Sequence, residues 1–182
     1  MKESGIVRKL DNLGRLVIPK EIRRCMRIKE GSPIEFGLLP SGEIVLCKYS
    51  LVSQITDYAD DFCKILGEIF DCCVYVADRD KVVSSYGVSK KMSIGLKLST
   101  QVLDVIDSKS SYTACKHENT TIIPILENDT NTYYCQTIFP ITIQGDVEGV
   151  VVLADTKEGR CFGVEHITTL RLAAKFISMQ ME

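Results

Sequence analysis

Apolar and polar positions alternate over short distances at the start of the chain. Two β-type runs, residues 5–10 and 15–18, flank the turn sequence DNLG and predict a hairpin. Pro19 follows directly, and proline is favoured in the first turn of a helix because its missing N–H needs no partner there. Apolar residues at helical spacing then predict a helix over 19–28, which we expect Gly31 to end.

A second hairpin is predicted directly after this helix. Its strands are the runs at 33–39 and 43–49, joined by a turn at 40–42. A unit of roughly fifty residues buries too little apolar surface to be comfortably stable alone without a disulfide or a metal. We therefore expect dimerisation through the strands, which places two copies of the first hairpin and helix on one surface.

Beyond residue 50 the segments with a regular apolar pattern are longer than those before it. Apolar positions at helical intervals over 53–70 predict a connecting helix, which either packs on the second domain or pairs between subunits. The alternation of helices and strands that follows predicts an α+β domain with an antiparallel sheet. The expected elements are strands at 72–78, 81–86, 110–114, 120–126, 133–141 and 147–155, and helices at 99–108 and 164–181. The expected divisions are a domain at 1–52, a linker helix at 53–70 and a domain at 71–182.

Charge is distributed unevenly between the two parts. Residues 2–29 hold nine Lys or Arg against three Asp or Glu, a net charge of +6, whereas residues 30–182 hold thirteen against twenty-one, a net of −8. A local positive field attracts a polyanion whatever the total charge is, and the formal total here is only −2. The asymmetry predicts a polyanion-binding head, for which duplex DNA is the candidate partner, joined to an acidic domain.

The cationic residues of this head are the predicted DNA contacts. A helix face with Lys and Arg at three- and four-residue steps suits the phosphate backbone, and the planar fork of Arg also matches guanine edges. The alternative is that some are solvated surface charges paired with Asp11, Glu21 or Glu30. The predicted contacts are Lys20, Arg23, Arg24 and Arg27 on the helix, and Arg8, Lys9 and Arg15 around the hairpin turn.

Composition and motifs exclude several classes of protein. With 45% hydrophobic and 25% charged residues, the chain has the composition of a soluble globular protein, and no apolar run is long enough for a membrane span, so we expect a cytoplasmic protein. The eight cysteines mostly lie in apolar runs without a C-x-x-C pair, which favours reduced thiols. Cys115 and His117 are too few for a metal site. No catalytic constellation or phosphate-binding loop is present, so we expect neither an enzyme nor a cofactor.

Residues 5–28, GIVRKLDNLGRLVIPKEIRRCMRI, closely resemble the AbrB-type DNA-binding domain. Its GRxVIPxExR core is present from Gly14 to Arg23, with Leu16 where valine is common. The resemblance covers about residues 1–50 and implies an N-terminal, all-β-dominated swapped-hairpin barrel with one short helix, built by an intertwined homodimer. It also implies contacts from Arg8, Arg15, Arg23 and Arg24 to double-stranded, A/T-rich DNA. Related barrels occur in antitoxins that repress their own operons, so an antitoxin-like autorepressor is one alternative, and a non-catalytic oligomeric scaffold is another.

A second resemblance lies near the C-terminus. FPITIQGDVEGVVVLAD, residues 139–155, resembles the penultimate hairpin of the GAF domain, which implies a central antiparallel sheet flanked by helices. An AbrB-type head joined to a GAF-like domain resembles sporulation regulators of endospore-forming bacteria. That implies a transcription factor that activates and represses genes late in the forespore, and a tetramer formed through the linker helix and the GAF-like domain.

Whether the GAF-like domain binds a small molecule is open. GAF domains elsewhere hold ligands in a pocket on the sheet, but this sequence has no cyclic-nucleotide signature and no assignable haem ligand. Aromatic residues in strands usually belong to the core, and we favour that interpretation here. The aromatic residues that are candidates for lining a pocket are Tyr75, Tyr86, Tyr112 and Phe139.

Overall fold

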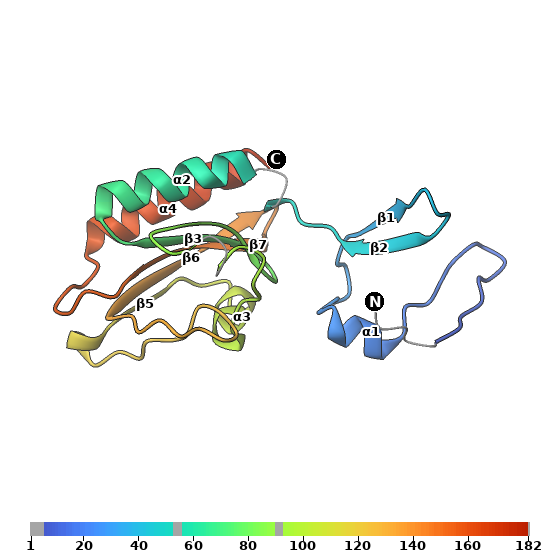
Figure 1. Ribbon diagram of the computed structural model, residues 1–182, viewed down its shortest axis with the longest axis horizontal. Coiled ribbons are helices and arrows are strands. Elements are labelled where there is room, and N and C mark those ends of the chain that lie inside the picture. The colour runs from blue at the N-terminus through green and yellow to red at the C-terminus, as the bar shows by residue number, and fades with distance from the viewer. Residues whose placement is uncertain (1–5, 53–55, 90–92, 182) are drawn as a thin grey trace. The chain divides into compact units, whose positions relative to one another are not determined.

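The structure is a computed structural model that describes residues 6–52, 56–89 and 93–181. The chain divides into two compact units, an N-terminal unit at Met1–Tyr49 and a C-terminal unit at Ser50–Glu182. In the N-terminal unit, helix α1 (Lys20–Cys25) precedes strands β1 (Ile34–Leu38) and β2 (Ile44–Lys48), which pair antiparallel (Figure 1). The second predicted hairpin is confirmed.

The first predicted hairpin keeps its turn but not its strands. Residues 6–19 contain no strand; Asp11 and Arg15 close the turn through the Asp11 N–H, which donates to the Arg15 carbonyl at 3.1 Å. A strand exists only where a neighbour accepts its backbone hydrogen bonds, and the two-stranded β1–β2 sheet does not extend to these residues. The expectation of strands at 5–10 and 15–18 is therefore wrong for the single chain, and Gly5 lies outside the described residues.

Helix α1 is shorter than the sequence suggests. It ends at Cys25, before the expected stop at Gly31. The Arg27 N–H donates to the carbonyl of Arg24 at 3.2 Å and the Ile28 N–H to that of Arg23 at 2.8 Å, with Arg27 at a φ of 52°. This is the Schellman motif, whose left-handed position is usually glycine. The chain ends the helix at this motif even though no glycine signals it.

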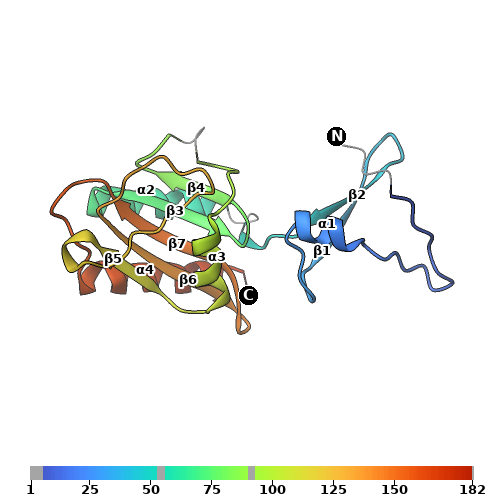
Figure 2. The same cartoon turned by 90° about the horizontal axis from the view of Figure 1, so that it is seen from below.

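The C-terminal unit is a five-stranded antiparallel sheet in the order β4-β3-β7-β6-β5 with helices on both faces. Helices α2 and α4 lie side by side on one face, and α3 covers the other (Figures 1 and 2). The elements are α2 (Thr56–Phe70), β3 (Cys73–Asp78), β4 (Val82–Tyr86), α3 (Thr100–Asp107), β5 (Tyr112–Cys115), β6 (Cys135–Ile143), β7 (Asp146–Asp155) and α4 (Val164–Met179). These positions match the predicted elements except the strand at 120–126, and the first three residues of the predicted 53–70 helix lie outside the described part.

The segment 120–126 is irregular because its backbone groups are used elsewhere. Its single ladder contact is an isolated bridge between Leu98 and Leu126. The N–H groups of Ile125 and Leu126 donate to the Asp129 carboxylate at 3.1 and 3.4 Å, and Pro124 has no N–H. The apolar run is therefore core packing beneath α3 rather than a sixth strand.

Two hydrophobic clusters hold the C-terminal unit together, one on each face of the sheet. The first joins Leu66 of α2 and Leu170 of α4 to Val74 and Leu153 of the sheet. The second packs α3 against the opposite face. Buried on both faces, β7 reads as the continuous apolar run VVVLA rather than as an alternating strand.

The cysteines differ from the sequence expectation at one pair. Cys115, at the end of β5, and Cys161, in the segment between β7 and α4, form a disulfide with their Cα atoms 5.6 Å apart. The other six cysteines are free thiols, as expected. The pairing could not be seen in the sequence because 46 positions separate the two residues.

Candidate nucleic-acid interface

The seven predicted DNA-contacting residues lie on the surface of the N-terminal unit. Six of them are exposed and Arg27 is half-buried. Their placement follows from local structure, since four belong to α1 and its C-terminal motif and three to the chain around the turn. They are seven of the nine Lys and Arg residues in 2–29, a segment whose net charge is +6.

The turn is built by Asp11 and presents Arg15. One carboxylate oxygen of Asp11 accepts the N–H groups of Leu13 at 3.0 Å and Arg15 at 2.8 Å, and the other accepts Nε of Arg15 at 2.7 Å. These contacts, above all the backbone N–H of Arg15, lower the pKa of Asp11. Gly14 has a φ of 74°, which suits glycine at this point of the turn.

The ion pair between Arg15 and Asp11 agrees only in part with the alternative that these cations are surface charges paired with acids. The Arg15 side chain remains 72% exposed although its Nε is hydrogen-bonded. A guanidinium has five N–H donors, so one engaged edge leaves donors for a second acceptor while fixing the side chain's direction. The role of Asp11 as the anchor of Arg15 was not predicted, although the Asp-x-x-Gly turn was a signal for it.

Helix α1 displays its cations on its exposed face. Pro19 is buried and is the residue before the helix, one position earlier than expected, where its carbonyl accepts the Arg23 N–H at 3.0 Å. Arg23 and Arg24 lie exposed in the last turn, while Ile22 is half-buried. The helix therefore exposes two adjacent arginines to solvent, while the buried Pro19 anchors its N-terminal end.

The surface around these cations is unusually apolar. Between residues 6 and 49, Pro19 is the only residue that is buried. Large apolar side chains are exposed instead, reaching 85% at Val7 and 76% at Leu38. Contiguous apolar exposure on a small unit marks an interaction surface. The exposed large apolar residues are Ile6, Val7, Leu10, Leu13, Leu16, Val17, Phe36, Leu38, Leu39 and Ile44.

The four aromatic residues considered as pocket lining are part of the packing. Tyr75 is fully buried and its hydroxyl lies 2.8 Å from that of Tyr133; burial raises the pKa of both phenols. The Tyr112 hydroxyl donates to the carbonyl of Thr121 at 2.6 Å. Phe139 and Tyr86 pack against the cluster beneath α2 and α4. The core interpretation is confirmed for Tyr75, Tyr112 and Phe139, whereas Tyr86 also lines a surface pocket.

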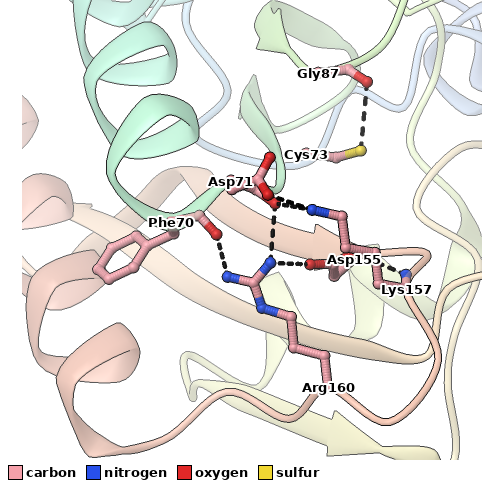
Figure 3. A network of polar contacts seen from close by, with 7 residues as sticks. All are labelled: Phe70, Asp71, Cys73, Gly87, Asp155, Lys157 and Arg160. Atoms are coloured by element: carbon pink, nitrogen blue, oxygen red, sulfur yellow. Dashed lines mark hydrogen bonds and ion pairs between the residues drawn. The ribbon is translucent and has the colours of Figure 1, made fainter.

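A surface pocket of about 590 Å³ lies where α2, β4 and β7 end and β3 begins. Beside it, the Arg160 guanidinium donates to the carbonyls of Phe70 and Asp71 and to the Asp155 carboxylate, while Lys157 pairs with Asp71 (Figure 3). Lys157 lowers the pKa of Asp71. These charges neutralise one another, so the network fastens three elements together rather than attracting a ligand of one sign.

The two parts of the chain match two families of known proteins. Residues 54–182 match the family described as "Stage V sporulation protein T C-terminal, transcription factor". Residues 7–53 match the family described as "Antidote-toxin recognition MazE, bacterial antitoxin". No helix of the described residues is long and apolar enough to cross a membrane.

Similar proteins agree with this division. Stage V sporulation protein T of Bacillus subtilis (strain 168) is 37% identical over 182 residues, which is 100% of this chain and 99% of that protein. Transition state regulatory protein AbrB of the same organism is 37% identical over 93 residues, 51% of this chain and 88% of that protein.

Solved structures show the fold of the C-terminal unit. The GAF domain of a phosphoenolpyruvate-protein phosphotransferase from Acinetobacter superposes with a TM-score of 0.57 at 16% identity, over 74% of this chain and 83% of that one. The GAF domain/HD domain protein from Geobacter sulfurreducens gives 0.54 at 14% identity, over 73% and 96%. The predicted fold, an AbrB-like domain followed by an α+β GAF-like domain, is confirmed, and the chain belongs to the stage V sporulation protein T family of transcription factors.

Proposed function

We propose that this sporulation transcription regulator binds double-stranded DNA through the seven exposed and half-exposed cations of its N-terminal unit. The observation that carries the proposal is their gathering on a turn and a short helix in a chain that is otherwise acidic. Backbone phosphates attract such a cluster without regard to sequence, and sequence-dependent DNA shape then discriminates between sites. We take A/T-rich duplex as the preferred target, in the compartment that holds the DNA, the cytoplasm.

Dimerisation is the first step of this proposal. The apolar side chains exposed around Val7, Val17 and Leu38 need a cover, and the unpaired backbone of residues 6–19 needs strand partners. A second copy of the same unit supplies both when the first hairpins exchange between subunits, because identical strands are complementary across a two-fold axis. The exchange also brings the two α1 helices, with Arg23 and Arg24, to one DNA-facing surface.

The C-terminal unit supplies a second contact between copies. Tyr58, Ile65 and Ile69 form an exposed stripe along α2, and Leu172 and Met179 continue it on α4. Phe62 and Phe176, whose ring centroids are 5.1 Å apart, join the two helices beneath this stripe. Pairing of two such helix faces makes a four-helix bundle. Dimers joined through these bundles become tetramers, which raise DNA affinity by multivalency.

Both signs of regulation fit this arrangement, and we propose that the protein activates some genes and represses others according to the position of its site. The antitoxin match over residues 7–53 favours a second candidate, repression of the protein's own operon. The transcription-factor match over residues 54–182 covers more of the chain, so the first candidate is preferred. We assign the GAF-like unit to assembly, with modulation by an unidentified ligand as a secondary role.

The test is DNA binding by the full chain and by Arg23→Ala/Arg24→Ala. Both arginines are exposed, so the variant should keep its circular dichroism spectrum and oligomeric mass. Two arginines in each of two subunits make four phosphate contacts, so the slope of log K against log salt should fall by about 3.6 from roughly 0.9 per contact. Fluorescence anisotropy of a labelled A/T-rich duplex at several salt concentrations measures it.

The matched control is Arg171→Ala/Lys175→Ala on the exposed side of α4, which removes the same charge from the C-terminal unit. It should bind DNA like the unchanged protein. Equal loss in both double variants would mean that net charge alone governs binding and that the N-terminal cluster is no interface.

A further inference from the structure

The Cys115–Cys161 disulfide joins a regular and an irregular part of the C-terminal unit. Cys115 is buried at the end of the edge strand β5 and belongs to the cluster beneath α2 and α4. Cys161 is half-buried in the segment 156–163, which connects β7 to α4 and contains no helix or strand. The bond therefore fastens an irregular segment to the helix-covered face of the sheet.

Residues before and after Cys161 in the sequence contact the C-terminal end of α2. On one side, Arg160 donates to the carbonyl of Phe70, the last residue of α2, to that of Asp71 just beyond it at 2.9 Å, and to Asp155 at 2.7 Å (Figure 3). These carbonyls have no partner within the helix, so Arg160 acts as its cap. On the other side, the ring of His166 lies between Phe162 and Phe70, at centroid distances of 4.9 and 4.5 Å.

We propose that Cys115 and Cys161 form a reversible redox site whose oxidation state sets how firmly residues 156–163 hold the end of α2. A disulfide in a protein of the reducing cytoplasm is more often regulatory than structural. The consequence for assembly rests on the function proposed above, since α2 carries the apolar stripe that pairs with a second copy.

The reaction needs a two-electron oxidant, for which we propose a low-molecular-weight disulfide. The Cys161 thiolate, on the half-exposed side, attacks one sulfur of the small disulfide and releases the other as a thiolate. The Cys115 sulfur, held beside Cys161, then attacks the Cys161 sulfur and displaces the remaining small thiolate, which takes up the Cys115 proton. The two protein sulfurs lose two electrons, the small disulfide is reduced to two thiols, and the protons of the two cysteines pass to them. Reduction by a small thiol runs the same steps in reverse, starting at Cys161.

Neighbouring cysteines do not compete for this exchange. Cys135 is the cross-strand partner of Cys115, and Cys72 lies in the same cluster. Burial raises the pKa of Cys135 to about 11 and that of Cys72 to about 12, so neither is a thiolate near neutral pH. Cys25 and Cys47 are exposed and react with any small disulfide, so they are replaced by serine in the test background.

The first experiment uses the full chain as Cys25→Ser/Cys47→Ser, equilibrated in mixtures of oxidised and reduced glutathione. Alkylation followed by peptide mass mapping should show two fewer free thiols in the oxidising mixture, both lost from the Cys115–Cys161 pair, and full recovery in the reducing one. A pair that does not form, that bonds to Cys135 instead, or that cannot be reduced by glutathione overturns the proposal.

The second experiment asks whether the bond acts on α2. Hydrogen exchange at residues 156–163 and at the last turn of α2 should be faster in the reduced form and in Cys161→Ser. Arg160→Gln should still form the disulfide but lose the redox effect on α2, because it lacks the guanidinium that caps the helix. Exchange at α2 that ignores the oxidation state of the unchanged pair contradicts the proposal.

The third experiment compares DNA binding by the two forms. The oxidised form should assemble and bind A/T-rich duplex more tightly, by on the order of fivefold, the lower end of ordinary coupling between sites. Cys161→Ser should bind like the reduced form in both mixtures. Equal binding by the two forms removes the regulatory role, whereas absence of binding in both refutes the proposed function and leaves the thiol result standing.

Discussion

The two units of this chain solve the problem of a hydrophobic core in different ways. The C-terminal unit buries apolar residues on both faces of a five-stranded sheet. The N-terminal unit buries only Pro19 among residues 6–49 and exposes side chains such as Val7 and Phe36. The difference teaches that the cationic part has no core of its own within one chain, which is why we propose that a partner completes its fold. On the function proposed above, we expect DNA binding and dimerisation to be linked, because the interface for DNA then needs the partner.

The largest effect should come from separating the units. A fragment of residues 1–55 should unfold on dilution, since binding of a second copy stabilises its folded form by mass action. Its melting temperature, followed by circular dichroism, should rise over a hundredfold range of concentration. It should also bind DNA more weakly than the full chain at equal salt, because multivalency is lost. A concentration-independent melting temperature with a monomeric mass would remove the distinction between the two units.

The next largest effect contrasts a glycine from each unit. In β7, a Cβ at Gly149 would lie 2.2 Å from the backbone oxygen of Ala77, which cannot move without breaking the β3–β7 ladder. In β1, a Cβ at Gly37 has no neighbour closer than 3.8 Å. Gly149→Ala should therefore lower the free energy of unfolding by about 1–3 kcal/mol, as overpacking does.

Gly37→Ala is the matched control, and it should be neutral or stabilise by about 0.5 kcal/mol, because glycine weakens a strand interior. Urea unfolding of the full chain, monitored separately for each unit, gives both values. A large loss from Gly37→Ala would show that β1 is packed tightly against a partner that the single chain lacks, which would sharpen the dimer proposal.

Much of the C-terminal unit could be predicted because its signals are local. Buried strands such as VVVLA are continuous apolar runs, and the Gln144–Gly145 turn of the β6–β7 hairpin, with positive φ at both residues, is marked by its glycine. The segment 120–126 was mistaken for a strand because it has the same apolar composition. The side chain of Asp129, three to four positions further along the chain, and the missing N–H of Pro124 keep the segment out of the sheet.

In the N-terminal site, the functional residue types could be predicted from the sequence, but the local backbone structure could not. The sequence motif identified the candidate DNA-contacting cations, and the structure places these residues on the surface. The strands at 5–10 and 15–18 did not follow, because strand formation needs a partner that one chain does not contain. The end of α1 at Cys25, followed by Arg27 in a left-handed conformation, and the disulfide across 46 residues depend on three-dimensional closure, for which the sequence carries no local signal.

A smaller effect is expected at Arg27, whose φ of 52° is normally reserved for glycine. Arg27→Gly should raise the stability of the N-terminal unit by about 1 kcal/mol, the cost of a left-handed L-residue. It should also weaken DNA binding, because a proposed contact is removed. Arg27→Ala separates the two effects, since it removes the cation and keeps the backbone cost. Thermal melting and anisotropy measure them, and equal melting temperatures for the glycine and alanine variants would contradict the backbone argument.

The smallest expected effect is a loss of DNA affinity on replacing Asp11. It is also the most discriminating, because simple electrostatics predicts a gain of affinity when an acid is removed. Removing an acid beside a DNA interface should raise affinity, and Glu21→Ala on α1 should do so modestly. Asp11→Ala should lower affinity instead, by severalfold, because Asp11 closes the turn and fixes the direction of Arg15 through contacts of 2.7 and 2.8 Å. The lowered pKa of Asp11 means that this anchoring is fully present above the ordinary value of 3.8 and is lost only as the pH falls below it. The difference between the two variants should therefore be constant in anisotropy titrations between pH 6 and 8. If Asp11→Ala binds more tightly, Arg15 needs no anchor, and the turn contributes charge rather than a defined geometry to the interface.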